Sequence, residues 1–222
     1  MQHDLFLFDF DGLLVDTEPL HYKAYQSVLD ALGLNLTWSF PKYCQIAQVS
    51  SPYLREQLNH HVPELSHYDW DTLYSAKKKA YLDLLSAYPL KLMPGVMPFL
   101  NQLKERAVPH AVVTHSPKEQ IDAIRKRLPM LNTIPYWFTR EDYQEPKPAP
   151  DGYLTAWKAL GGDHPVGFED SIRGLQSLKA AGIAPVLIRP DYYPPVDETT
   201  CEGALCAQSF TEIGLERFFP GV

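Results

Sequence analysis

An unbroken apolar run near the start of the chain ends in a pair of acidic residues. Residues 5–8 are all apolar, and Asp9 and Asp11 follow immediately. A run of this length is typical of a strand in a parallel sheet covered on both faces, although a buried helical segment has the same pattern. Residues two apart on an extended chain point to the same side, so both carboxylates would converge on one small volume. Left unpaired, they would take up protons or recruit a cation.

Helical spacing of apolar residues dominates the next part of the chain, from residue 17 to about residue 88. Thr17 is a potential N-cap, and an apolar stripe from Leu20 to Leu32 predicts a helix that ends at Gly33. Residues 51–58 and 70–88 are also predicted to be helical. No buried strand is evident in this stretch, which is therefore predicted to be an all-helical domain.

Helices and strands alternate after Pro94 and Gly95. The helices are predicted at residues 96–106, 118–128, 151–160 and 172–181, and the strands at residues 110–113, 136–138, 166–168 and 185–188. Short connections between such apolar strands favour right-handed crossovers onto one parallel sheet, which would include the first strand. We therefore expect an α/β fold with a doubly wound, Rossmann-like parallel-sheet core formed by residues 1–16 and 90–222. A helical cap, residues 17–89, would be inserted after the first strand.

Charge and apolar run lengths argue against two classes of protein. The 222-residue chain has a formal net charge of −7 and a pI near 5.6, which argues against a nucleic-acid-binding protein. No apolar stretch reaches the roughly 20 residues that a membrane-spanning helix needs. The only basic run, Lys77-Lys78-Lys79, is interpreted as the solvated face of a helix.

The cysteines follow no metal-binding or disulfide spacing. We interpret Cys44, Cys201 and Cys206 as packing or incidental residues. Free cysteines suit a reducing compartment, and the first residues lack the features of a secretory signal. We therefore expect a cytoplasmic protein, and a monomer.

Polar residues follow the predicted strands at positions that would meet in space. They are Asp9 and Asp11 after the first strand, Thr114, His115 and Ser116 after residues 110–113, Lys147 in a proline-rich loop, and Glu169 and Asp170 after residues 166–168. The carboxyl ends of parallel strands meet at one edge of a sheet, so these groups are expected to converge. Carboxylates would hold Mg²⁺, while Lys147 and Thr114 would bind phosphoryl oxygens.

Four motifs occur in the order found in a known superfamily. They are DFDGLLVDTE from Asp9, VVTHS from Val112, KPAPD from Lys147 and GFEDS from Gly167, with Gly174 shortly after. In these motifs the chain resembles the haloacid dehalogenase superfamily of phosphohydrolases. Within it, the chain is similar to members with a helical cap after the first motif, which include β-phosphoglucomutase. The resemblance covers nearly the whole predicted core.

The resemblance implies a role for each acidic residue. Asp9 would be the nucleophile that forms an aspartyl-phosphate, and Asp11 would protonate the leaving group and then activate water. Mg²⁺ would lie between the Asp9 carboxylate, the Asp11 backbone carbonyl and Asp170, with Glu169 a weaker or water-mediated ligand. An acid at position 11 also favours phosphate-ester chemistry over dehalogenation.

The remaining site residues are assigned in the same way. Thr114 and Lys147 would bind the phosphoryl group, although Thr114 could instead only cap the end of its strand. His115 either meets the substrate or turns outward. His21, in the first cap helix, either assists the proton chemistry or is an ordinary interface residue.

The cap separates the two leading functions. Mutase-like relatives carry a basic, glycine-containing loop in the cap, resembling Lys-Gly-x-Ser followed by Arg, whereas residues 47–52 here are AQVSSP. Without such cations the distal phosphate of a bisphosphorylated intermediate lacks a partner, unless Lys42 or Arg55 supplies one. We therefore expect an enzyme, a Mg²⁺-dependent phosphatase acting on a small soluble phosphate ester. A β-phosphoglucomutase-like phosphomutase is the alternative, and a non-catalytic phosphate-ligand-binding or scaffold module is a third hypothesis.

Overall fold

The computed structural model describes residues 3–197 and 199–219, and the chain divides into two compact units. The first unit comprises Met1–Asp16, Lys91–Asp191 and Pro195–Val222, and the second comprises Thr17–Leu90 and Tyr192–Pro194. The sequence pattern places the helical cap at residues 17–89. The structure assigns to the second unit, in addition, three residues from late in the chain.

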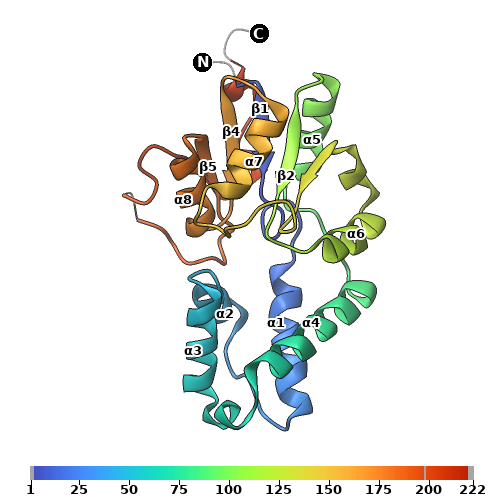
Figure 1. Ribbon diagram of the computed structural model, residues 1–222, viewed down its shortest axis with the longest axis vertical. Helices are drawn as coiled ribbons and strands as arrows, with labels where there is room; N and C mark the ends of the chain where they lie inside the picture. Colours follow the sequence, from blue (N-terminus) through green and yellow to red (C-terminus); the bar gives the residue numbers. More distant parts are fainter. Residues whose placement is uncertain (1–2, 198, 220–222) are drawn as a thin grey trace. The chain divides into compact units, whose positions relative to one another are not determined.

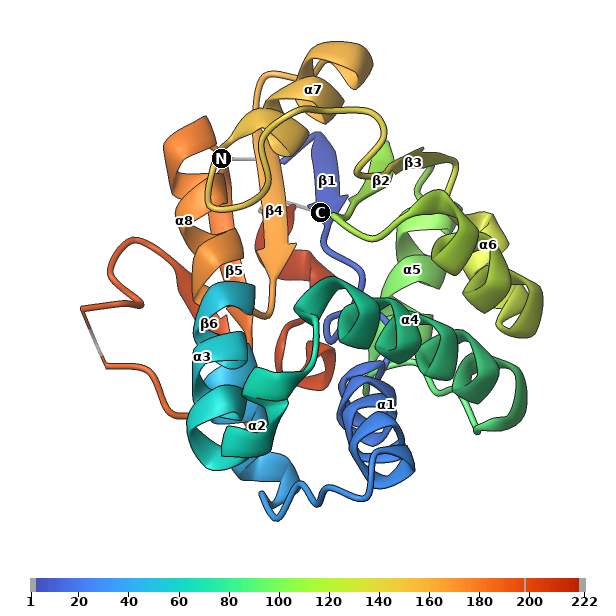
Figure 2. The same cartoon turned by 60° about the horizontal axis from the view of Figure 1, so that its bottom comes forward.

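A six-stranded parallel sheet forms the centre of the first unit (Figures 1 and 2). Its order is β3-β2-β1-β4-β5-β6, so the chain adds strands first on one side of β1 and then on the other. This arrangement confirms the predicted doubly wound α/β class. The strands are β1 (Leu5–Phe8), β2 (His110–Val113), β3 (Tyr136–Phe138), β4 (Pro165–Glu169), β5 (Ala184–Ile188) and β6 (Leu205–Ala207).

The helices of the first unit follow the predicted alternation. They are α5 (Val96–Glu105), α6 (Lys118–Arg127), α7 (Asp151–Leu160) and α8 (Ile172–Ala181), with the 3₁₀ turns η2 (Pro129–Thr133), η3 (Phe210–Glu212) and η4 (Leu215–Phe218). Each of the four α-helices ends within one residue of its predicted bounds. The short edge strand β6 is an element that the apolar pattern does not predict.

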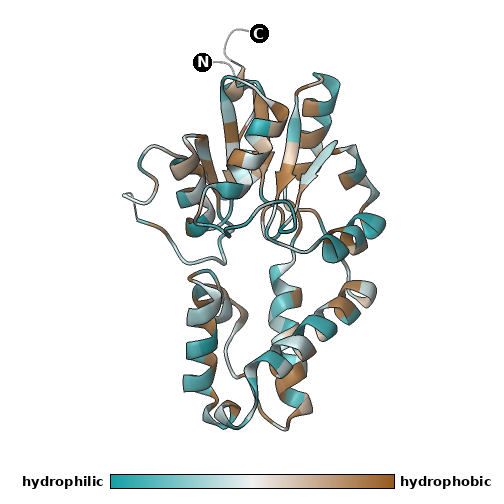
Figure 3. Cartoon of the chain, in the orientation of Figure 1, coloured by the Kyte–Doolittle hydropathy of each residue, from teal (hydrophilic) through white to brown (hydrophobic). Residues whose placement is uncertain are grey.

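Alternating side chains of β1 cover the two faces of the sheet. Leu5 and Leu7 pack in one cluster with residues of α7 and α8. Phe6 and Phe8 lie on the other face against Phe99 of α5, with ring centroids 6.4 and 6.1 Å away. Figure 3 shows brown, hydrophobic colouring on inner strands of this sheet such as β2, whereas the edge strand β3 is pale. Both faces of β1 are thus buried, which explains its unbroken apolar run.

The second unit is helical. Its elements are α1 (Glu18–Ala31), α2 (Phe40–Ala47), α3 (Ser51–His61), the 3₁₀ turn η1 (Pro63–His67) and α4 (Trp70–Ala87). The apolar pattern does not predict α2, which is only eight residues long and has Ser39 as its N-cap. Thr17 is the N-cap residue of α1, as predicted, but its side chain makes no capping hydrogen bond. Tyr193, from the late segment, is buried in the core of this unit.

Two cysteines are paired, contrary to the prediction. Cys201 and Cys206 form a disulfide, and Cys44 is a buried free thiol. The prediction was wrong because the geometry of the intervening turn, in which Ala204 N donates to Cys201 O, decides whether two nearby cysteines can meet. The cysteines therefore give no argument for a reducing compartment. No helix in the described part of the chain is long and apolar enough to span a membrane.

Candidate active site

The first acidic pair lies where β1 ends and the chain turns sharply. Asp9 extends the sheet by one residue, because its N–H donates to the Phe168 carbonyl of β4 at 2.9 Å. Gly12 then adopts a φ of 76°, a left-handed conformation that favours glycine. The turn is closed by a hydrogen bond from Gly12 N to Val15 O. Asp9 is thereby fixed at the carboxyl edge of the sheet, and Asp11 lies in the turn beyond it.

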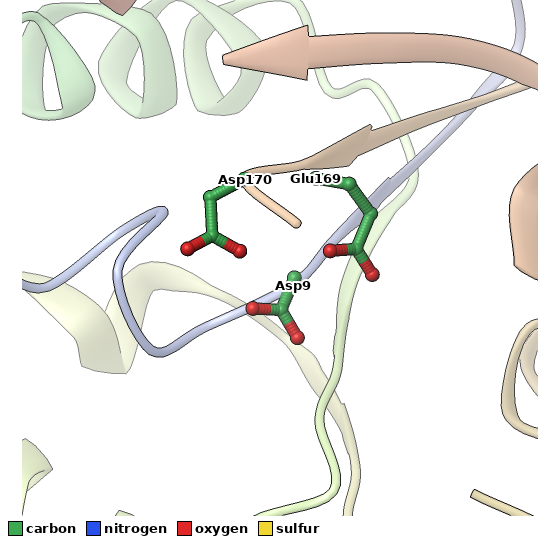
Figure 4. Close-up of side chains that lie close together, drawn as sticks. All are labelled: Asp9, Glu169 and Asp170. Atoms are coloured by element: carbon green, nitrogen blue, oxygen red, sulfur yellow. The ribbon is translucent and has the colours of Figure 1, made fainter. Parts of the chain in front are cut away.

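Three carboxyl groups gather at the ends of β1 and β4 (Figure 4). Oxygen atoms of Asp9, Glu169 and Asp170 all lie within 4.8 Å of one another. Oxygen ligands of this kind suit a hard divalent cation such as Mg²⁺. The Asp11 carboxylate is not part of this group, and its predicted contribution, a backbone carbonyl, stays a prediction.

Lys147 reaches this carboxylate group from the proline-rich loop before α7. Its Nζ lies 2.5 Å from Asp9 Oδ1 and 2.6 Å from Glu169 Oε1, and it donates to the Val113 carbonyl at 3.0 Å. Burial disfavours the charged form of Lys147, but the Asp9 and Glu169 carboxylates outweigh it and raise the pKa of Lys147 well above its usual value. Lys147 is therefore a permanent ammonium between two carboxylates.

Burial and neighbouring carboxylates disfavour the ionised form of Asp9. Burial raises the pKa of Asp9 to about 7, with Lys147 opposing the rise and Glu169 adding to it. A divalent cation held by the three carboxylates would oppose this rise and keep Asp9 ionised. The residues thus fit a metal ion in both charge and donor chemistry.

Glu169 is enclosed by a close approach of α8. A Cβ atom on Gly174 would lie 1.8 Å from the carboxyl carbon of Glu169, so only glycine leaves room for this side chain. The Tyr153 hydroxyl donates to Glu169 Oε1 at 2.6 Å, and Ser171 Oγ donates to Oε2 at 3.3 Å. Glu169 therefore orients Lys147 as well as adding negative charge beside Asp9.

The Asp11 carboxylate is oriented by two side chains that follow β2. Ser116 Oγ donates to Asp11 Oδ2 at 2.5 Å, and Gln120 Nε2 donates to Oδ1 at 3.2 Å. Gln120 also donates to Ser116 Oγ at 3.1 Å. The sequence analysis includes Ser116 in a motif but gives it no role, and it does not identify Gln120 as a site residue. Ser116 and Gln120 are four residues apart across the start of α6, a spacing that can bring two side chains together but is weak evidence by itself.

The structure places the two other predicted phosphate ligands after β2. Thr114 is buried, and its hydroxyl accepts a hydrogen bond from Ser116 N at 3.1 Å, as in a strand-end cap. His115 is exposed, beside Tyr143 with ring centroids 5.9 Å apart. Its ring is still partly desolvated, and this desolvation, and then the charges of Arg140 and other nearby cations, lower the pKa of His115. Phosphate binding by Thr114 and His115 stays a prediction.

His21 belongs to a buried cluster in the second unit. It stacks on Tyr81 with ring centroids 4.1 Å apart, and its Nδ1 accepts a hydrogen bond from the Lys77 ammonium at 2.7 Å. Burial, and then Lys77, hold the pKa of His21 well below its usual value. Lys77 is only 7% exposed and lies 5.1 Å from the Tyr25 ring centroid. The predicted solvated position is therefore wrong for Lys77, because aromatic rings cover it.

Comparison with known proteins assigns the family. The model of the haloacid dehalogenase-like hydrolases matches residues 3–182, which include every predicted site residue. The chain belongs to the haloacid dehalogenase-like hydrolases. The sequence resemblance is thus confirmed.

Relatives of this hydrolase include phosphatases. Protein CbbY of Rhodobacter capsulatus is 28% identical over 201 residues, covering 86% of this chain and 88% of that protein. The fructose-1-phosphate phosphatase YqaB of Escherichia coli (strain K12) is 31% identical over 189 residues, covering 82% of this chain and 95% of that protein. A solved structure, the HAD hydrolase, family IA, variant 3 from Entamoeba histolytica HM-1:IMSS, has a TM-score of 0.79 and 25% identity, covering 98% and 97% of the two chains. This hydrolase is accordingly a phosphatase.

Proposed function

We propose that this hydrolase is a Mg²⁺-dependent phosphatase that cleaves a phosphorylated carbohydrate through an aspartyl-phosphate on Asp9. The observation that carries the proposal is the contact of one ammonium, Lys147, with both Asp9 and Glu169 beside Asp170. A carboxylate nucleophile has to be ionised and close to positive charge when it meets an anionic phosphate. The name of the relative YqaB supports a sugar phosphate as substrate.

Asp9 is placed to attack phosphorus in the first of two transfers. A carboxylate oxygen of Asp9 forms a bond to phosphorus while the bond to the leaving sugar oxygen breaks. The Lys147 ammonium neutralises the phosphoryl oxygens as charge moves between them, and the Thr114 hydroxyl donates a hydrogen bond to them. Asp9 and Asp170 would hold Mg²⁺ directly with the Asp11 carbonyl, and Glu169 would act indirectly. When bound, Mg²⁺ supplies the positive charge that lets two anions approach.

Asp11 moves the protons of both transfers. In the first, its carboxylic acid gives a proton to the departing sugar oxygen. In the second, its carboxylate takes a proton from the water that attacks the phosphorus of the aspartyl-phosphate, which releases inorganic phosphate and restores Asp9. The hydrogen bonds from Ser116 and Gln120 hold the Asp11 side chain in one orientation for both steps.

The second unit favours a phosphatase over a phosphomutase. The AQVSSP stretch spans the end of α2 and the start of α3, where Ser50 is an N-cap. Arg55, a candidate for a distal phosphate clamp, lies over the Trp70 ring at 5.1 Å. A phosphomutase has to retain a bisphosphorylated intermediate, and a strong clamp for its second phosphate is missing from this stretch. Water is then the acceptor of the phosphoryl group.

A panel of phosphorylated sugars, nucleotides and glycolytic acids tests the proposal. Phosphate release is measured with Mg²⁺ and with excess EDTA, and Asp9→Asn protein controls for contaminating phosphatases. We expect release from one or more sugar phosphates, none with EDTA and none from Asp9→Asn. β-Glucose 1-phosphate with a trace of the 1,6-bisphosphate distinguishes the alternative, since a mutase would form glucose 6-phosphate without phosphate release. No turnover in either assay would favour a non-catalytic module.

A further inference from the structure

Arg189, at the end of β5, connects the carboxylate group to the edge of the sheet. The side chain is buried, and its Nη1 donates to the backbone carbonyl of Asp170 at 3.0 Å. Its own backbone N–H donates to the carbonyl of Ala207 on β6 at 2.8 Å. A hydrogen bond to the Asp170 carbonyl fixes the peptide from which the Asp170 carboxylate projects. The position of Asp170 therefore depends on Arg189, and that of Arg189 depends on β6.

The disulfide restrains β6. Cys206 lies in this three-residue strand opposite Leu187 of β5, next to Ala207, which receives the hydrogen bond from Arg189. An edge strand this short has few ladder hydrogen bonds of its own. The bridge ties Cys206 to Cys201, and Lys179 of α8 fixes the same loop by donating to the Glu202 carbonyl at 2.7 Å.

We propose that Arg189 is a positioning residue for the metal ligand Asp170, and that the Cys201–Cys206 disulfide sets the Mg²⁺ affinity by holding Arg189 in place. The inference rests on the proposed function, since it takes Asp170 as a Mg²⁺ ligand. A group that orients a metal ligand without touching the metal commonly changes metal affinity about 10- to 100-fold when it is removed. Reduction of the disulfide also weakens Mg²⁺ binding, because it loosens β6 and with it the position of Arg189.

Reduction is a two-electron thiol–disulfide exchange with a dithiol. One thiol of the dithiol loses a proton, and its thiolate attacks a sulfur of the bridge and displaces the other cysteine as a thiolate, which takes up that proton. The second thiolate of the reagent then closes a cyclic disulfide and releases the second cysteine. The reagent is oxidised, and the two protein thiols carry the two electrons and two protons. The Cys206 side chain is exposed, which gives a small dithiol access to it.

Calorimetric titration of the substrate-free protein with Mg²⁺ tests the proposal. Wild type is titrated in its oxidised form and after treatment with dithiothreitol, with thiol counting to verify each state. We expect reduction to weaken Mg²⁺ binding, and a Cys201→Ser/Cys206→Ser variant to bind weakly in both conditions. Arg189→Met is expected to weaken binding about 10-fold, and Arg189→Lys to restore part of the loss. Thermal unfolding of each variant separates this effect from a change in stability.

Each other outcome contradicts the inference in a distinct way. Equal Mg²⁺ affinity of oxidised and reduced wild type would overturn the role of the disulfide. Unchanged affinity in Arg189→Met would overturn the role of Arg189. If Arg189→Met does not fold, Arg189→Lys and the double serine variant still decide the question. Wild type that binds no Mg²⁺ in either state would contradict the proposed function as well, whereas the other outcomes leave that function intact.

Discussion

The Lys147 ammonium lies 2.5 Å from Oδ1 of Asp9. Removing one partner of a buried ion pair leaves the other charge uncompensated, which typically costs about 3 to 5 kcal/mol of stability. We therefore expect Lys147→Met to be destabilised by several kcal/mol, on the order of that range. Phosphate release should fall about 10²- to 10³-fold, as when a group that stabilises transition-state charge is removed.

Urea unfolding and a phosphate-release assay check the Lys147→Met prediction. Lys79→Met is the matched control, because Lys79 pairs with Asp83 on the surface and 79% of its side chain is exposed. Such a surface pair contributes little to stability. Lys147→Met behaving like Lys79→Met in both assays would contradict the assigned role of Lys147.

The raised pKa of Asp9 predicts that stability depends on pH when no divalent cation is present. Burial puts the pKa of Asp9 near 7 in the folded protein, compared with 3.8 for the unperturbed group. Between these values the folded state binds more protons than the unfolded state, so the ionisation of Asp9 lowers stability as pH rises from about 4 to about 7. We expect Asp9→Asn in EDTA to gain stability relative to wild type across this window and to keep the gain at pH 8.

Urea unfolding in EDTA at pH 4, 6 and 8 measures this difference. A stability difference between Asp9→Asn and wild type that stays constant from pH 4 to pH 8 would show that Asp9 titrates as an ordinary carboxyl group. Repeating the series with Mg²⁺ is expected to reduce the advantage of Asp9→Asn, because a bound cation stabilises the ionised form.

Much of the fold could be predicted because its central strands are buried on both faces. The bounds of β1 coincide with an apolar run that ends in polar residues, and β2 adds only His110 to such a run. β6 is a three-residue edge strand with only partial burial. Residues 204–207 are apolar, but a run this short between a glycine and a polar residue does not distinguish a strand from a loop. α2 has too few turns for helical periodicity to stand out.

The parts of the site that could not be predicted depend on packing between residues far apart in the chain. Asp9 and Asp170 follow strands, so their convergence follows from parallel topology. Buried Lys77 forms a hydrogen bond with His21, which lies 56 residues away in the sequence. A run of three lysines does not by itself indicate which one faces inward. Gln120 similarly acquires its role only when α6 brings it to Asp11.

Ser116 and Gln120 are expected to act through the orientation of Asp11. Ser116→Ala removes a 2.5 Å hydrogen bond to the carboxylate and should lower kcat about 10-fold, a part of the roughly 10²- to 10⁴-fold contribution typical of a positioned acid or base. KM should change little, because the substrate does not depend on this bond for binding. Ser66→Ala, which loses a hydroxyl bonded to the Pro63 carbonyl, is the matched control. A change confined to KM would contradict the positioning role.

His21 makes the protein sensitive to acid. Burial and Lys77 depress the pKa of His21 in the folded state, so below pH 6.5, the ordinary value, the unfolded state binds more protons. The folded protein keeps its full stability with respect to His21 above pH 6.5, where the histidine is neutral in both states. Its free energy of unfolding declines as pH falls below 6.5, because protons then bind to His21 in the unfolded state. In His21→Asn the amide oxygen can still accept from Lys77 but does not titrate, so the variant should lose less stability between pH 7.5 and pH 5. Equal losses in both proteins, measured by urea unfolding, would refute the assignment.

Trapping the phosphoryl group on the enzyme is a direct test of the proposed aspartyl-phosphate on Asp9. Asp11→Asn protein is mixed with Mg²⁺ and p-nitrophenyl phosphate, whose leaving group departs without a proton from residue 11, so the first transfer can still occur. The mixture is quenched in acid and reduced with borohydride, which converts an aspartyl-phosphate to homoserine. Because residue 11 can then no longer activate water, we predict that homoserine accumulates at position 9, seen by peptide mass spectrometry, and that it is absent without substrate. Two results would contradict an aspartyl-phosphate on Asp9, provided that the wild-type protein releases phosphate. One is that neither protein yields homoserine at position 9, and the other is that homoserine forms at a different residue.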